Sequence, residues 1–128
     1  MKKILYEGKI FYSELEYIVY YILKKFYKIP DIKTQIRYTL TRFPSVLDHI
    51  LDFETPHNYI EVKGGWLLSR QQELQYLKTK TYWFVNQYNK KKFLLVVNNK
   101  KIILPGIKTI LVSDLEEYLY GQSICRKK

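Results

Sequence analysis

Glu61 and Lys63 are the residues of this chain whose types and spacing most directly suggest chemistry, because they stand two apart in an otherwise apolar segment. In a β-strand alternate side chains point to the same face, so the carboxylate and the ammonium group would share one face while Ile60 and Val62 enter the opposite layer. Asp48 lies on the preceding apolar segment, and its carboxylate can meet that of Glu61 if the two segments pair. Two carboxylates and a backbone carbonyl, here that of Val62, are ligands that Mg²⁺ takes from a protein, with positions left for water and a phosphate oxygen. With Lys63 to orient or deprotonate the attacking water and to offset negative charge in the transition state, the pattern predicts phosphodiester hydrolysis.

Asp52 is the alternative to Asp48 as the metal-binding aspartate, because the two share strand parity. Asp48 lies inside an apolar strand, whereas Asp52 stands near the turn, where aspartate is common for solvation, so Asp48 is favoured. If the hairpin pairs Asp52 directly across from Glu61, the assignment reverses. Cross-strand neighbours lie ~5 Å apart, and residues four positions along a strand lie ~13 Å apart.

The elements that must position these residues follow from hydrophobic periodicity and turn chemistry. We expect helices over 13–27, 69–88 and 114–120, and strands over 34–40, 46–53, 59–63, 93–97, 102–104 and 109–112. Ser13, Ser69 and Ser113 are expected to cap the three helices. The chain length predicts one domain over residues 1–128. The fold class expected is α/β (α+β), with a mixed central sheet flanked by helices.

The stretch from Asp48 to Lys63 resembles the mark of the PD-(D/E)xK nuclease superfamily, which is an aspartate, a hairpin and then Glu-x-Lys on the next strand. The expected order of elements, αβββαβ followed by a strand and a helix, also resembles that family. The resemblance implies a restriction-endonuclease-like core and Mg²⁺-dependent DNA cleavage, with Mn²⁺ able to substitute, and it makes Asp48, Glu61 and Lys63 catalytic. Residues 52–56, Asp-Phe-Glu-Thr-Pro, resemble the Asp-Phe-x-x-Pro form of some members, which keeps Asp52 open.

Glu16 receives a supporting metal role from the same resemblance, since residues 13–16, Ser-Glu-Leu-Glu, look like the opening of the family's first helix. The same four residues are also a capping box, which needs no metal to explain it. His49 and His57 have no metal-ligand spacing between them, so neither is expected to bind a metal, and His57 is interpreted as a turn residue.

The net charge of +10, from 22 Lys and Arg against 12 Asp and Glu, favours contact with a polyanion such as DNA. The residues expected to contact DNA are Arg37, Arg42, Arg70, Gln72, Lys78 and Lys80. Gln72 and Tyr76 resemble the Gln-x-x-x-Tyr of the exonuclease branch, although a polar helix face explains them equally well. Trp66 stands beside the expected site, where its ring would be able to stack on bases.

The leading hypothesis is a metal-dependent DNA endonuclease that selects DNA structure, similar to Holliday-junction resolvases, and serves recombination or repair. A bare core has little surface for reading bases in the major groove, and phosphate contacts carry no sequence information. By analogy with small nucleases of the family, a homodimer is expected so that two sites cut two strands. The alternatives are a recombination or repair exonuclease and a non-catalytic nucleic-acid-binding module that retains the fold.

The remaining composition restricts the class of protein and its surroundings. The longest apolar run, residues 18–23, is far shorter than the roughly 20 residues that cross a membrane. One cysteine, Cys125, permits no internal disulfide and no zinc cluster. We therefore expect a cytoplasmic protein that binds DNA, with no membrane association and no small-molecule substrate.

Overall fold

The central feature of the computed structural model is a mixed five-stranded sheet, which together with three α-helices and a short N-terminal hairpin makes up the residues described, 3–42 and 44–126. The strand order is β3-β4-β5-β6-β7. β3 pairs with β4 and β4 with β5 in antiparallel fashion, whereas β5–β6 and β6–β7 are parallel. The strands are β3 (Lys33–Arg42), β4 (Ser45–Glu54), β5 (Asn58–Lys63), β6 (Lys92–Val97) and β7 (Lys108–Leu111). The mixed α+β class expected from the sequence is confirmed.

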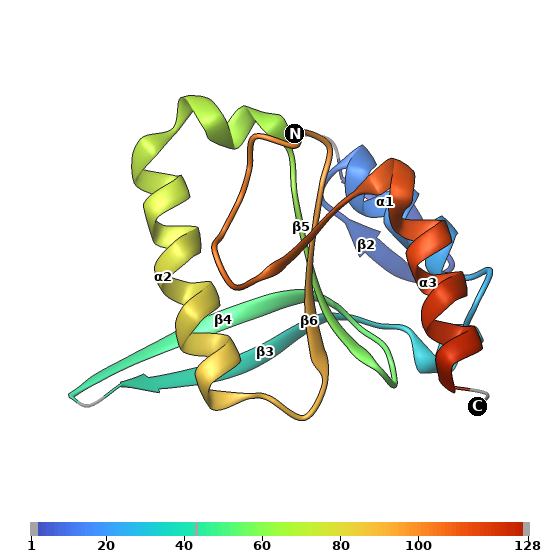
Figure 1. Ribbon diagram of the computed structural model, residues 1–128, viewed down its shortest axis with the longest axis horizontal. Helices are drawn as coiled ribbons and strands as arrows, with labels where there is room; N and C mark the ends of the chain where they lie inside the picture. The colour runs from blue at the N-terminus through green and yellow to red at the C-terminus, as the bar shows by residue number, and fades with distance from the viewer. Residues whose placement is uncertain (1–2, 43, 127–128) are drawn as a thin grey trace.

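Helices cover both faces of this sheet (Figure 1). α1 (Glu14–Leu23) and α3 (Val112–Arg126) contact each other, and their side chains share one core cluster. α2 (Gln71–Gln87) packs over the opposite face. In order along the chain these elements run α1-β3-β4-β5-α2-β6-β7-α3, which is the order predicted except for the strand expected over 102–104. Within the described ranges, no helix has the length and apolar character needed to cross a membrane.

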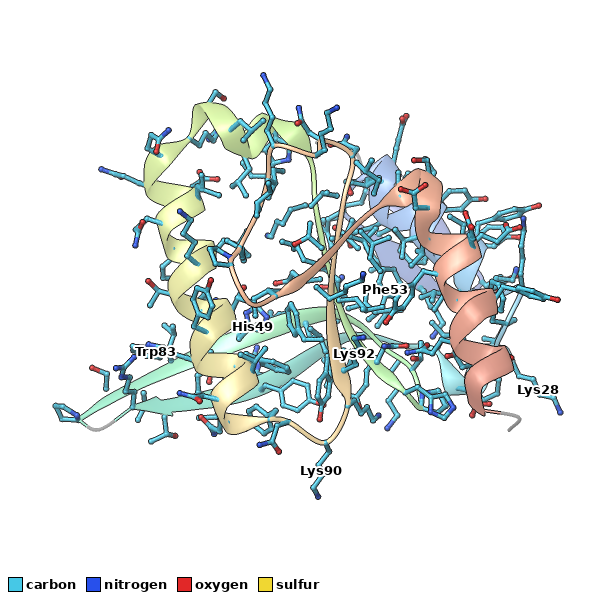
Figure 2. All side chains as sticks on the ribbon, in the orientation of Figure 1. Lys28, His49, Phe53, Trp83, Lys90 and Lys92 are labelled. Carbon is cyan, nitrogen blue, oxygen red and sulfur yellow. The ribbon has the colours of Figure 1, made fainter. Side chains whose placement is uncertain are left out.

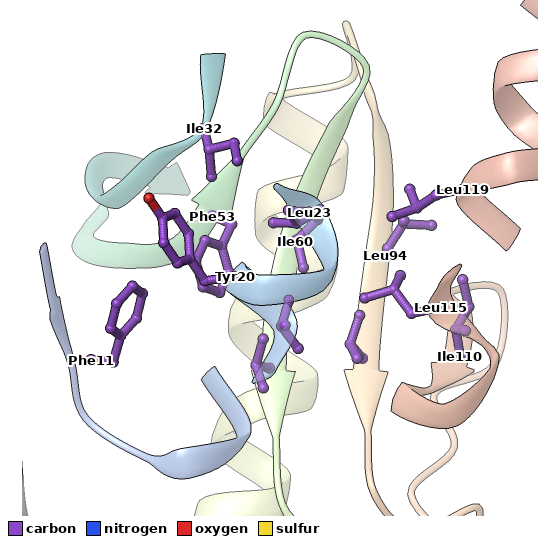
Figure 3. Packing of buried hydrophobic residues seen from close by; sticks show 13 residues of the cluster. Phe11, Tyr20, Leu23, Ile32, Phe53, Ile60, Leu94, Ile110, Leu115 and Leu119 are labelled. Carbon is purple, nitrogen blue, oxygen red and sulfur yellow. The ribbon is translucent and has the colours of Figure 1, made fainter. Parts of the chain in front are cut away.

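The hydrophobic core is divided into two clusters by the sheet. The cluster under α1 and α3 is drawn in Figure 3 and includes Phe11, Tyr20, Phe53, Leu94 and Leu115. The cluster under α2 includes Leu40, Leu51, Tyr59, Phe84 and Leu95. Because β6 contributes alternate residues to both clusters, it is buried on both sides, as central parallel strands usually are.

α1 begins as predicted and ends earlier than predicted. Ser13 is its N-cap, and the Ser13 hydroxyl accepts the backbone N–H of Glu16 at 3.1 Å, which confirms the cap. The helix ends at Leu23 rather than near residue 27, because Lys25 and Phe26 donate their N–H groups to carbonyls three residues back, a tighter turn than the α-helix.

The other two predicted caps are wrong. A 3₁₀-helix, η2 (Gly65–Ser69), precedes α2, and the Ser69 hydroxyl donates to the Trp66 carbonyl at 2.8 Å instead of capping. Arg70 occupies the N-cap position of α2 without a side-chain hydrogen bond. α3 begins at Val112, so Ser113 lies inside the helix.

Residues 102–104 are not a strand, although Ile102 and Leu104 are almost fully buried. They belong to the connection between β6 and β7, which must cross over because the two strands are parallel. Their burial in the α2-side cluster explains the apolar pattern without a strand.

The N-terminus forms a hairpin of β1 (Ile4–Tyr6) and β2 (Lys9–Phe11), a separate element that the sequence patterns do not single out. Its turn residues Glu7 and Gly8 have φ angles of 53° and 76°, as the tight turn of a two-residue hairpin requires. Phe11 at its end is fully buried, and it joins this hairpin to the α1-side core.

Candidate active site

Asp52 and Glu61 lie against each other where β4 and β5 part. The two strands pair Glu54 with Tyr59 and Phe53 with Ile60, so the same register sets Asp52 opposite Glu61. There the backbone N–H of Asp52 donates to Glu61 Oε1 at 3.3 Å, and the N–H of Val62 donates to Asp52 Oδ2 at 2.8 Å. The two carboxyl groups thus accept the backbone N–H groups of Asp52 and Val62 at the point where the ladder between the strands ends.

Asp48 does not meet Glu61, which corrects the pairing expected from the sequence. Asp48 is paired with Thr39 of β3, its side chain is 57% exposed, and its Oδ2 lies 3.8 Å from Nη1 of Arg37. It is four residues from Asp52 along β4, a separation of ~13 Å. Asp52 takes this place because the turn after Glu54 is short. The pairing of β4 with β5 therefore begins at Glu54 and Tyr59, and the same register brings Asp52 opposite Glu61.

A local kink in β3 lies directly opposite Asp52. Thr34 pairs with Phe53 and Ile36 with Leu51, whereas Gln35 between them is unpaired and has a left-handed backbone with φ of 52°. Leu51 packs in the α2-side cluster and Phe53 in the α1-side cluster. In a regular strand, two residues separated by one position would lie on the same face. β4 therefore exchanges its buried face at Asp52.

Glu16 is brought to the same place from α1. Its side chain is nearly buried, and its Oε1 accepts a hydrogen bond from the Gln35 amide at 3.2 Å. Burial raises the pKa of Glu16 to about 7, with a further contribution from the charge of Asp52. The capping hydrogen bond and the approach to Asp52 coexist, so the two interpretations of Glu16 do not exclude each other.

The carboxyl pair is electrostatically strained. Burial raises the pKa of Asp52 well above its ordinary value, and the proximity of Glu61 raises it further. Burial also raises the pKa of Glu61, whereas the ammonium group of Lys63 acts in the opposite direction on both groups. Each carboxyl group acts on the pKa of the other, and a proton on one of them would relieve the repulsion between them. A bound cation would perform the same neutralisation without that proton.

His49 is a site residue that sequence reasoning missed. Its Nε2 lies 3.2 Å from Oε2 of Glu61, it is only 5% exposed, and Figure 2 shows it close to α2, where it packs edge-on against Phe84. Burial and the nearby charge of Lys80 lower the pKa of His49 to about 4, so the ring is neutral where it lies beside Glu61. Nδ1 has no hydrogen-bond partner in the described part of the chain. The sequence signal that could have identified it is strand alternation, because His49 stands two positions from Leu51 and therefore shares its buried face.

A cavity of about 480 Å³ opens beside these residues. Asp52, Glu61 and Lys63 line it together with His49, and Lys63 is half-buried. A larger hollow of about 1060 Å³ lies near β7 and α3, but its acidic residues, Asp114 and Glu117, are exposed. The smaller cavity is therefore the better candidate for chemistry, since it alone of the two adjoins a pair of carboxyl groups that are shielded from solvent, Glu61 buried and Asp52 half-buried.

The six residues expected to contact DNA differ in how close they lie to this cavity. Arg37 and Lys80 line the cavity, whereas Arg70 lies just outside it, with its guanidinium over Trp66 and hydrogen-bonded to Glu73. The other three do not line it: Arg42 stacks on Trp83, and Gln72 and Lys78 stand elsewhere on α2.

Asp52 and Glu61 form a donor set that suits Mg²⁺. No cluster of three or more His, Cys, Asp or Glu side chains arranged to hold a metal occurs among the residues described. Mg²⁺ does not need one, because it is commonly held by one or two carboxylates while keeping several waters or substrate oxygens. The pKa values of both carboxyl groups are raised, which means that their ionised forms are disfavoured and that a cation between them would be stabilising.

Comparisons of this chain with family models, with curated proteins and with solved structures found no match. The functional assignment therefore rests on the chemistry of this site.

Proposed function

We propose that this chain is a divalent-metal-dependent deoxyribonuclease that hydrolyses phosphodiester bonds at Asp52, Glu61 and Lys63. The observation that carries the proposal is the pairing of half-buried Asp52 with buried Glu61, with Lys63 two residues beyond Glu61 on β5 and lining the same cavity. Burying two acids beside each other destabilises the fold and repels a polyanion. A module that only binds DNA has no use for such a pair, which favours the enzyme over the non-catalytic alternative.

Asp52 and Glu61 would hold Mg²⁺ or Mn²⁺, and the bound cation would supply charge neutralisation at the scissile phosphate. Lys63 lines the same cavity, where its ammonium group would orient the attacking water and offset negative charge that develops on phosphate oxygens. Glu16 would add a further carboxylate once positive charge is present, since its pKa of about 7 leaves it easily ionised. The Val62 carbonyl remains a predicted ligand.

His49 would position Glu61 rather than touch the substrate. Its Nε2 lies 3.2 Å from Oε2 and would restrict that oxygen, while the backbone N–H of Asp52 donates to Oε1. Outer hydrogen bonds of this kind hold a ligating carboxylate in one orientation. The same contact would keep Glu61 from turning away when a cation binds.

DNA is the proposed substrate because of the net charge of +10 and because Arg37 and Lys80 line the cavity beside the carboxyl pair. We propose a restriction-endonuclease-like core and an endonuclease that selects DNA structure, as junction resolvases do. Cutting two strands at a junction would need two sites, and hence a homodimer.

The test is a plasmid-nicking assay with Mg²⁺, Mn²⁺, Ca²⁺ or EDTA. We expect nicking with Mg²⁺ and Mn²⁺ and none with EDTA. Lys63→Ala should keep the fold and the affinity for DNA but lose at least about 100-fold in cleavage rate, since its charge acts on the transition state. Lys90→Ala, which removes an exposed lysine from the loop after α2 (Figure 2), is the matched control and should cleave normally. Absence of nicking with every metal, or full activity of Lys63→Ala, would refute the proposal.

A further inference from the structure

Two large aromatic side chains stand exposed at the cavity that holds the carboxyl pair. Trp66 of η2 is 53% exposed and Tyr76 of α2 is 52% exposed, and both line the cavity together with Asp52 and Glu61. Single exposed aromatic residues are ordinary on a protein surface. Two of them bordering one cavity that charged residues also line are the arrangement expected of a surface that receives a flat, partly apolar ligand.

Each of these rings is accompanied by a cation. The guanidinium carbon of Arg70 lies 5.4 Å from the centre of the Trp66 ring, and Nζ of Lys80 lies 4.9 Å from the centre of the Tyr76 ring. A nucleotide presents a flat base joined to a phosphate, and a ring beside a cation is complementary to both parts. The net charge of +10 favours this polyanionic ligand over a basic or a neutral apolar partner.

Trp66 is held in place by the glycine turn before it. A Cβ atom at Gly64 would lie 2.9 Å from Cδ1 of the Trp66 indole, so the ring lies directly against the backbone at Gly64. The next residue, Gly65, donates its N–H to the side chain of Asn98 at 2.6 Å, which fixes the turn to the end of β6. The indole is thus preorganised beside Lys63, which directly precedes this turn.

We propose that Trp66 and Tyr76 form a stacking surface for unpaired bases, so that the site takes a single-stranded DNA segment, such as a flap, an end or the open part of a branch. In an intact duplex both faces of a base are covered by its neighbours, and only an unstacked base can lie on an aromatic side chain. This inference rests on the proposed nuclease function, since it names the substrate of that same site.

The test is binding in EDTA, where no cleavage occurs, of a labelled oligothymidylate and of a duplex of equal length at one salt concentration, measured by fluorescence anisotropy. We expect Trp66→Ala and Tyr76→Ala each to weaken single-strand binding about tenfold and duplex binding less than about twofold. Tyr120→Ala, which removes a tyrosine that is 62% exposed on α3, is the matched control and should bind both DNAs normally.

A second readout follows Trp66 itself. The chain has two tryptophans, Trp66 and Trp83, so Trp83→Phe leaves Trp66 as the only indole. Its fluorescence should be quenched by the single strand and hardly changed by the duplex. Unchanged single-strand affinity of Trp66→Ala, an equal loss on both DNAs, or no quenching would overturn the stacking surface.

The two proposals fail in different ways. Failure of stacking alone leaves metal-dependent plasmid nicking intact and unaffected by Trp66→Ala. Failure of the nuclease alone leaves selective single-strand binding intact, with no cleavage of any DNA when Mg²⁺ is added.

Discussion

Glu16 allows the sharpest test of the electrostatics at this site, through the substitution Glu16→Gln. The pKa of this carboxyl rises from 4.5 to about 7 because α1 buries it close to Asp52. A carboxyl with a raised pKa binds its proton more tightly in the folded state, so its contribution to stability is lost as the pH rises from 4.5 through 7. At about 1.4 kcal/mol for each tenfold change in proton affinity, ionised Glu16 costs the folded state about 3 kcal/mol at pH ~8 and less than about 1 kcal/mol at pH ~5.

Glutamine removes this cost and keeps an oxygen that can accept the hydrogen bond from Gln35. In EDTA, urea unfolding followed by circular dichroism should therefore show Glu16→Gln to be more stable than the parent protein by about 3 kcal/mol at pH ~8, and nearly equal at pH ~5. Adding Mg²⁺ at the higher pH should narrow the difference, because a cation compensates the ionised carboxylate of the parent protein.

Glu14→Gln is the matched control, since Glu14 is exposed in the same first turn of α1. It should lose up to about 1 kcal/mol, because a carboxylate near a helix N-terminus is favourable. If the stability gain of Glu16→Gln is the same at both pH values, ionisation of Glu16 is not its cause. A loss of stability at pH ~8 would mean that other groups already neutralise the charge of this carboxylate in the metal-free protein.

Three further predictions concern the carboxyl pair. Asp52→Asn should abolish cleavage, whereas Asp48→Asn should lower the cleavage rate at most a few-fold. Both variants are assayed on plasmid and four-way-junction DNA after circular dichroism confirms that they fold. The reverse ranking would identify Asp48 as the ligand, and two active variants would exclude this hairpin from catalysis. Mg²⁺ or Mn²⁺ should raise the melting temperature, because a cation relieves the repulsion between Asp52 and Glu61. Ca²⁺ should bind without supporting turnover. A melting temperature that no divalent ion changes would contradict the proposed metal site. His49, with a pKa lowered from 6.5 to about 4, should cost the fold about 3 kcal/mol between pH ~7 and pH ~4 as its ring becomes charged. His49→Gln should remove that part of the acid destabilisation in urea titrations, and an unchanged acid profile would contradict it.

The sequence by itself determined the local features of this protein. Alternation in residues 59–63 and the turn before them are short-range properties, so the position of Glu61 and Lys63 on one strand face follows from the pattern alone. The Ser13 cap and the order of the main helices and strands follow for the same reason, because capping and periodicity depend on neighbours within a few residues.

The tertiary structure decided which aspartate joins Glu61. Asp48 and Asp52 have the same parity, and the position of Asp52 near the turn, which favoured Asp48, does not decide between them, because the choice depends on how β4 is registered against β5. The kink at Gln35 in a third strand and the approach of Glu16 from α1 add to the surroundings of Asp52. These contacts join segments far apart in the chain, so only packing brings them together.

The same distinction holds for His49 and for the cationic residues. Sequence spacing offered no partner for His49, whereas the fold buries its ring under α2 and sets its Nε2 against Glu61. Lys78 and Lys80 both stand on α2, yet only Lys80 lines the cavity, since the rotation of the packed helix decides which side chain reaches it. Local chemistry thus placed the candidate residues on their elements, and long-range packing, whose geometry no short window of sequence contains, selected those that meet.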